Sequence, residues 1–307
     1  MAAAALTIAG CATAARAPTA APSTDPFVIV LGTAQDGGHP QTGTKPGEAW
    51  APERLRLVAS LAIVDPASGE RWLIDVTPDV REQLHALDEA SPAGGVPGLA
   101  GIFLTHAHVG HYAGLIHLGH EVIGAEGVPV HAMPRMREFL STNGPWDQLV
   151  RYRNIEIRPL EDGARVQLNE RVAITPFLVP HRDEYSETVG FRIDGPNRSV
   201  LFLPDIDKWE RWDRRIEDVM AEVDVAYLDG TFYDDGEIPG RDMAEIPHPF
   251  IVETMRRFER LPAVERQKIR FIHLNRSNPV QWEGSEARRA VERAGFGVAV
   301  RLERLTL

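Results

Sequence analysis

The segment Thr105–His111, with the sequence THAHVGH, decides the fold of this chain. It places three histidines within six residues, directly after the apolar run Gly101–Leu104. Neutral imidazole is a nitrogen ligand suited to zinc, iron or copper, and three imidazoles at the exit of a strand can face one point in space. Crowding them together brings no packing advantage otherwise. The segment therefore predicts a metal site at a strand end rather than three unrelated surface histidines.

The same organisation recurs along the chain, because several apolar runs end in a residue that can bind metal or carry chemistry. These pairs are Val172–Pro180 with His181, Ser199–Pro204 with Asp205, Val223–Leu228 with Asp229, and Ile269–Ile272 with His273. Helical patterns near 212–221, 248–259 and 284–294 separate the late strands. This order predicts helices on the outer faces of packed sheets, with an active centre where strand ends meet.

The first half of the chain is predicted to begin with strands. Phe27–Leu31 leads into a glycine-rich loop, and the runs 57–64 and 71–75 form a hairpin. Thr77 is a plausible N-cap for a helix that extends to Ala90. The alternation over 155–177 is typical of a β-meander.

The composition is that of a globular protein, and its charge argues against nucleic-acid binding. The chain has 307 residues, enough for a full core, and 44 acidic against 33 basic side chains give a net charge of -11. Nucleic-acid binders concentrate lysine and arginine, so we expect a small-molecule substrate and no nucleic-acid partner.

The N-terminus resembles the lipobox of bacterial lipoproteins, in which the cysteine becomes the acylated first residue. Cys11, the single cysteine, ends the segment Leu6–Cys11, and residues 12–26 are rich in Ala, Pro, Thr and Ser. We therefore divide the chain into a signal remnant with a flexible tether, 1–26, and one domain, 27–307. The expectation is a periplasmic or membrane-anchored lipoprotein attached through acylated Cys11. The alternative is an untargeted cytoplasmic protein, because Met1–Gly10 is short and lacks Lys and Arg.

The order of these motifs resembles the metallo-β-lactamase superfamily. A His-x-His-x-Gly-His segment is followed by a His, an Asp and a His, each at a strand exit, and the likeness covers about residues 27–307. The resemblance implies an α/β fold, a four-layer αβ/βα sandwich with a one- or two-metal centre at the sheet edges. Residues 31–41 and 271–279 resemble segments of the coenzyme PQQ synthesis protein B branch, which is associated with maturation of the quinone cofactor.

The resemblance also implies a division of the ligands. His106, His108 and His181 would hold the first metal, and His111, Asp205 and His273 the second, with Asp205 bridging the two. One or two Zn²⁺ ions are the expected cofactors. Three imidazoles with an open position lower the pKa of a bound water to about 7, which gives a nucleophile at neutral pH.

One position departs from the superfamily pattern, which usually has Asp where this chain has Gly110. Without that carboxylate the second set is two imidazoles and one carboxylate, the ligand class of non-haem Fe(II) oxygenases, so iron is a possible occupant. Asp36 or His39 from the first glycine-rich loop could compensate. The plain alternative is that Asp36 only starts a turn.

Asp205 and His248 are the catalytic candidates. His248 precedes a predicted helix in a layout that resembles the tRNA 3'-processing ribonuclease branch, and a histidine there can protonate a leaving group. Equally, it can cap the helix. Asp75 and Asp229 are expected to orient metal-binding imidazoles rather than to bind metal. The loop 182–185 either lines the substrate entrance or is merely solvated, and the remaining histidines are expected on the surface or in packing: His85, His117, His120 and His131.

These observations favour a hydrolase that uses metal-activated water on an ester, lactone, amide or phosphodiester bond. The alternative is an iron-dependent oxidation or hydroxylation, as inferred for the PQQ-associated branch. A third class is a metal-holding binding or sensor protein without turnover. Substrate specificity in the superfamily lies in loops whose shape residue types do not give.

Overall fold

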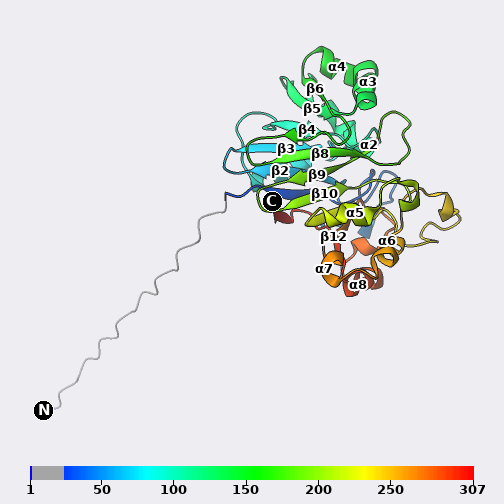
Figure 1. Ribbon diagram of the computed structural model, residues 1–307. Helices are drawn as coiled ribbons and strands as arrows, with labels where there is room; N and C mark the ends of the chain where they lie inside the picture. The colour runs from blue at the N-terminus through cyan, green and yellow to red at the C-terminus, as the bar shows by residue number, and fades with distance from the viewer. Residues whose placement is uncertain (2–23) are drawn as a thin grey trace.

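Two seven-stranded sheets face each other in the computed structural model, which describes Met1 and residues 24–307 (Figure 1). The lipobox-like segment that ends at Cys11, and most of the predicted tether, lie outside the described residues. Within the described residues, no helix has the length and apolar character needed to cross a membrane.

Each sheet combines an antiparallel part with a parallel part. The first sheet runs in the order β14 (Arg304–Thr306), β1 (Phe27–Gly32), β2 (Ser60–Asp65), β3 (Glu70–Ile74), β4 (Gly101–Phe103), β5 (Val128–Ala132) and β6 (Ile155–Pro159). The second runs in the order β13 (Gly297–Val298), β12 (Ile269–Ile272), β11 (Val225–Asp229), β10 (Ser199–Leu203), β9 (Val189–Asp194), β8 (Ala173–Leu178) and β7 (Val166–Gln167). In the first sheet β14, β1, β2 and β3 pair antiparallel and β3 to β6 pair parallel. In the second sheet β7 to β10 pair antiparallel and β10 to β13 pair parallel.

Helices cover the outer face of each sheet. Over the first sheet lie α1 (Val80–Ala90), α2 (Val109–Tyr112), η3 (Ala113–Leu118), α3 (Pro134–Thr142) and α4 (Trp146–Arg151). Over the second lie η4 (Trp209–Arg211), α5 (Ile216–Ala221), α6 (Ile251–Phe258), η6 (Pro279–Gln281) and α8 (Glu286–Arg293). The remaining short helices are η1 (Glu48–Trp50), η2 (Pro52–Arg54), η5 (Met243–Glu245) and α7 (Ala263–Arg266).

Because successive side chains of a strand point to opposite faces of its sheet, the apolar residues form three layers, one between the sheets and one under the helices on each outer face. Along β1, Val28 and Val30 pack between the sheets, whereas Ile29 and Leu31 pack against the outer helices. The layer between the sheets also buries large aromatic side chains such as Phe191 completely, each worth about 1.5–3 kcal/mol. The predicted αβ/βα sandwich is therefore confirmed.

Two local predictions are wrong. Residues 155–177 do not form a meander, because β6 pairs with β5 in the first sheet while β7 and β8 belong to the second. Alternation identifies a strand but does not assign it to a sheet. Helix α1 begins at Val80 rather than near Thr77, because the Thr77 Oγ1 atom accepts a hydrogen bond from the Asp79 N–H and closes a turn before the helix.

Candidate metal centre

The carboxyl ends of the parallel strands bring the predicted site residues to one edge of the sandwich. Asp75 follows β3 and His106 follows β4, while Asp205 follows β10 and His273 follows β12. Asp75 and His273 have φ values of 64° and 63°, a left-handed conformation that non-glycine residues rarely adopt. Such backbone costs of order 1–3 kcal/mol and is concentrated at functional sites.

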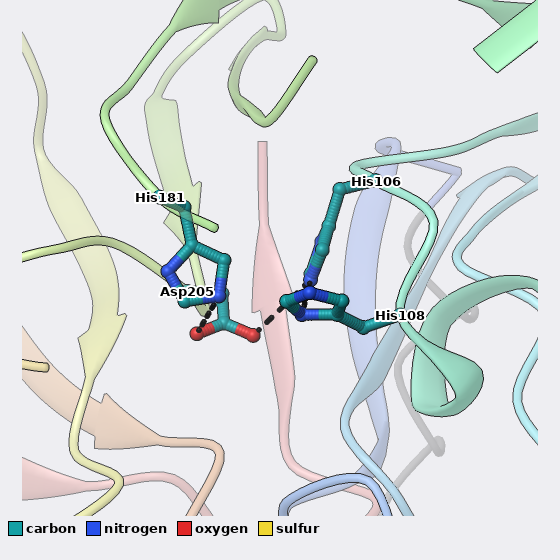
Figure 2. Close-up of side chains that lie close together, drawn as sticks. All are labelled: His106, His108, His181 and Asp205. Carbon is teal, nitrogen blue, oxygen red and sulfur yellow. Dashed lines mark hydrogen bonds and ion pairs between the residues drawn. The ribbon is translucent and has the colours of Figure 1, made fainter. Parts of the chain in front are cut away.

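The first cluster contains His106, His108, His181 and Asp205. One ligand atom from each lies within 4.8 Å of the others, and Figure 2 shows the four side chains pointing toward one another. The His106 Nε2 and His108 Nδ1 atoms are 2.8 Å apart. The Asp205 Oδ1 atom lies 3.3 Å from His181 Nε2, and Oδ2 lies 3.4 Å from His106 Nε2.

The second cluster contains His111, His273 and Asp36, whose ligand atoms also lie within 4.8 Å of one another. The Asp36 Oδ1 atom is 3.4 Å from His111 Nε2. Asp205 lies between the clusters, since its Oδ2 atom is also 3.5 Å from His111 Nε2 and 3.6 Å from His273 Nε2. The structure thus brings together all six residues predicted as ligands and adds Asp36.

The ring nitrogen of each histidine that points away from the clusters has a partner. Such contacts fix the tautomer and aim the other nitrogen at the metal. The pairs are His106 Nδ1 with Thr105 Oγ1 at 3.0 Å, His108 Nε2 with Glu184 Oε2 at 3.0 Å, His111 Nδ1 with Asp75 Oδ2 at 2.7 Å, His181 Nδ1 with Asp207 Oδ1 at 3.2 Å, and His273 Nδ1 with Thr231 Oγ1 at 2.9 Å.

Several of the inward-facing atoms have no hydrogen bond. Buried polar atoms in folded proteins nearly always have one, so a group of unsatisfied atoms needs an explanation. A cation in each cluster, held by nitrogen and carboxylate donors, would satisfy these atoms, and the residues present therefore fit a metal. Within the described part of the chain, these buried atoms are the Nε2 atoms of His111, His181 and His273 and the Oδ1 atoms of Asp36 and Asp205.

The charge states of His106 and Asp205 suit metal binding. Burial, together with the neighbouring His111, lowers the pKa of His106 well below its usual value, so this ring stays neutral and can ligate. Burial opposes ionisation of Asp205, but the imidazoles of His181 and His273 outweigh it and hold the pKa of that carboxyl well below its usual range. Asp205 is therefore an ionised carboxylate between the two clusters.

His248 is buried beside the clusters and does not cap helix α6. The Phe250 N–H at the start of α6 donates instead to the Glu253 side chain. The His248 Nδ1 atom lies 2.8 Å from Asp229 Oδ2 and 3.1 Å from Asp205 Oδ1. Burial opposes protonation, but these two carboxylates outweigh it and raise the pKa of His248 to about 10.

The other histidines lie apart from the clusters, as predicted for most of them. His39, offered as an alternative to Asp36, packs its ring edge-on against Trp282 with 5.0 Å between centroids. His131 stacks on Phe103 at 4.2 Å. Among the described residues none of the following belongs to a metal-binding cluster: His39, His85, His117, His120 and His131.

Three residues that orient the rings carried no prediction, namely Thr105, Thr231 and Asp207, and a fourth, Glu184, was expected only in a loop that lines the substrate entrance or is solvated. Thr105 and Thr231 each stand between an imidazole and a buried aspartate, while Asp207 and Glu184 contact His181 and His108. Their positions offer a weak sequence signal, because Thr105 directly precedes His106 and Asp207 lies two residues after Asp205.

Comparison with known proteins agrees with this geometry. A model described as "Beta-lactamase superfamily domain" matches residues 70–273. Coenzyme PQQ synthesis protein B of Methylobacterium nodulans is 30% identical over 315 aligned residues, which cover 89% of this chain and 99% of that protein. The chain belongs to the beta-lactamase superfamily, in the branch of coenzyme PQQ synthesis protein B.

Solved structures support the same placement. The crystal structure of Zn²⁺-bound PqqB from Methylobacterium extorquens is similar, with a TM-score of 0.74 and 25% identity, and the match covers 92% of this chain and 100% of that one. A diphosphatase from the PhnP family has a TM-score of 0.64 and 21% identity over 92% of this chain and 97% of its own, a likeness of fold. This superfamily member therefore combines a PqqB-like chain with a full His/Asp metal-binding cluster.

Proposed function

We propose that this chain is a metal-dependent hydrolase that acts on an ester, lactone, amide or phosphodiester bond. The observation that carries the proposal is the convergence of five imidazoles and two carboxylates, five of whose buried inward atoms make no hydrogen bond. One or two Zn²⁺ ions bound there would lower the pKa of water to about 7 and stabilise developing negative charge.

Other residues of the chain would hold the ligand rings in place and provide a proton for the leaving group. Each ligand ring is fixed by a second contact, so the donors are held in place before substrate arrives. His248 is held in its protonated form by Asp229 and Asp205. Its Nδ1 atom is engaged by these carboxylates, so a proton passed to a leaving group comes from Nε2.

An iron-dependent oxidation is the second candidate. His111, His273 and Asp36 form two imidazoles and one carboxylate, by type the ligand set of non-haem Fe(II) oxygenases. The relatives named coenzyme PQQ synthesis protein B also favour a role in making a cofactor over general hydrolysis.

Metal-controlled assays distinguish these functions. Protein loaded with Zn²⁺ is expected to hydrolyse members of a panel of chromogenic esters, lactones and phosphodiesters, and His108→Ala is expected to lower kcat/KM by about 10³-fold or more, since a metal contributes several kcal/mol to transition-state stabilisation. His85→Ala is the matched control, because His85 is exposed and lies outside both clusters.

Other outcomes contradict the hydrolase. Oxygen consumption with Fe²⁺ and no hydrolysis with Zn²⁺ would support the oxidative candidate. Stoichiometric metal binding without turnover under either condition would support a binding or sensor protein.

A further inference from the structure

Position 110 lacks the carboxylate that the superfamily pattern has there, and in the structure a carboxylate from another segment occupies the space that a side chain at 110 would enter. We propose that Asp36, in the loop after β1, is a ligand of the second metal ion and replaces the missing residue. The inference rests on the proposed function in one respect, that the two clusters bind metal.

Asp36 is aimed at the second cluster. Its Oδ1 atom lies 3.4 Å from His111 Nε2, and it groups with His111 and His273 within 4.8 Å. This oxygen is buried and makes no hydrogen bond to any described residue. The other oxygen, Oδ2, is 3.5 Å from the Gln35 side-chain nitrogen. An unsatisfied carboxylate oxygen beside two imidazole nitrogens is a ligand position rather than the start of a turn.

Gly110 makes room for Asp36. A Cβ atom at position 110 would lie 2.2 Å from Asp36 Oδ1 and 2.6 Å from Asp36 Cα. The contact with Cα involves the Asp36 backbone, so rotating the Asp36 side chain would not relieve it. Any side chain at position 110 would therefore force Asp36 out of its present position. Gly110 lies inside helix α2 without a positive φ, so its backbone does not require glycine. Glycine is needed at position 110 because it leaves space for Asp36.

The loop that carries Asp36 is fixed by the exit of strand β12. The Gln35 N–H donates to the Leu274 carbonyl at 2.9 Å, and the Leu274 N–H donates to the Thr33 carbonyl at 2.8 Å. The Asn275 side chain also donates to Gln35 Oε1 at 2.6 Å. Because Leu274 follows His273, the same backbone bonds place Asp36 and His273 relative to each other.

With Asp36 the second cluster has the donors of a complete site. His111, His273 and Asp36 face it, and Asp205 Oδ2 lies within 3.6 Å of both ring nitrogens. The carboxylate is thus supplied by a different segment of the chain instead of being lost. A second ion is therefore expected in spite of Gly110.

Metal stoichiometry tests the assignment without relying on turnover. Full-length protein is stripped with chelator, reloaded with Zn²⁺ alone and analysed by mass spectrometry of the metal, with affinities from chelator competition. The wild type is expected to hold two ions per chain. Asp36→Ala and Asp36→Asn are expected to keep the first ion and to weaken the second by at least about 10–100-fold, the range seen when even an orienting partner is removed.

Two further variants separate the ligand role from loop structure. Gly110→Ala removes no donor, but its methyl group displaces Asp36, so it is expected to lose the second ion as well. His39→Ala changes the same loop and is expected to keep both ions. The retained first ion shows in each case that the variant is folded.

The contradicting results are distinct. Two tightly bound ions in both Asp36 variants, or a single ion in the wild type, would overturn the role of Asp36 while leaving a metal-dependent hydrolase possible. No bound ion in the wild type would overturn the proposed function itself.

Discussion

Asp75 at the edge of the first sheet and Asp229 at the edge of the second make matching contacts. In each, Oδ1 accepts hydrogen bonds from the N–H and the Oγ1 of one threonine, Thr105 or Thr231. In each, Oδ2 lies 2.7 or 2.8 Å from the Nδ1 atom of a histidine, His111 or His248. Each threonine hydroxyl then reaches the Nδ1 atom of a second histidine, His106 or His273.

The two sheet edges differ in the orientation of the histidine ring that contacts the aspartate directly. His111 gives Nδ1 to Asp75 and turns Nε2 toward Asp205 and Asp36. His248 instead presents the same nitrogen, Nδ1, to both Asp229 and Asp205. Under the proposed function, the same kind of support would hold a metal ligand, His111, in the first sheet and a charged proton donor, His248, in the second. The orientation of the ring, rather than the supporting carboxylate, would then decide the role.

Removing His248 is the largest test of that difference. His248→Ala is expected to lower kcat by about 10²–10⁴-fold, the usual contribution of a positioned general acid, with metal content unchanged. The loss should be steep for substrates with poor leaving groups and small for p-nitrophenyl esters, whose leaving group needs no proton. A plot of kcat against leaving-group pKa measures this.

The opposite pattern would make the halves equivalent. If His248→Ala lost an ion, His248 would be a metal ligand like His111, and if the rate loss were independent of the leaving group, His248 would not be the proton donor. The different orientations of the His111 and His248 rings would then not correspond to different roles.

Much of this site could be predicted from sequence, because parallel strands end at one sheet edge. The positions of His106, His181 and Asp205 after apolar runs predict that they meet at this edge, and the resemblance to the superfamily implies which of them share a metal. Asp36 remained one of two options with His39. Its position depends on bonds between the loop and Leu274, some 240 residues away in the chain, which no local pattern contains.

Unlike the supporting role of Asp75 and Asp229, the orienting contacts of Thr105, Thr231 and Glu184 could not be predicted, and for a different reason. Thr105 and Thr231 act through rotamers that place one hydroxyl between a ring and a carboxylate, and threonines beside histidines or aspartates are common. Glu184 reaches His108 from a loop whose polar composition fits a solvated segment equally well. The sequence does not assign β6 to its sheet, because the alternation of apolar and polar residues shows which face of a strand is buried but not which strand it pairs with.

Replacing each aspartate separates the two halves by metal affinity. Asp75 supports His106 in the first cluster through Thr105, and His111 in the second directly. Asp75→Asn is therefore expected to weaken both ions by about 10–100-fold. Asp229→Asn is expected to weaken the second ion more than the first, because Asp229 supports His273 through Thr231 and reaches the shared residue Asp205 only through the Ile206 N–H. Chelator competition measures both, and equal effects on both ions in the two variants would contradict the division.

The two threonines give the smallest and most local comparison. Thr105→Val removes the acceptor of His106 Nδ1 and is expected to weaken the first ion, while Thr231→Val does the same to His273 and the second ion. One hydrogen bond of about 0.5–1.5 kcal/mol corresponds to roughly a two- to tenfold change in affinity. Thr→Ser at either position keeps the hydroxyl and should restore binding, whereas a loss that serine does not restore would assign the effect to packing of the methyl group. If Thr105→Val weakened the second ion instead of the first, the 3.3 Å contact between Thr105 Oγ1 and His111 Nδ1 would be the functional one, and the pairing of the two halves would have to be redrawn.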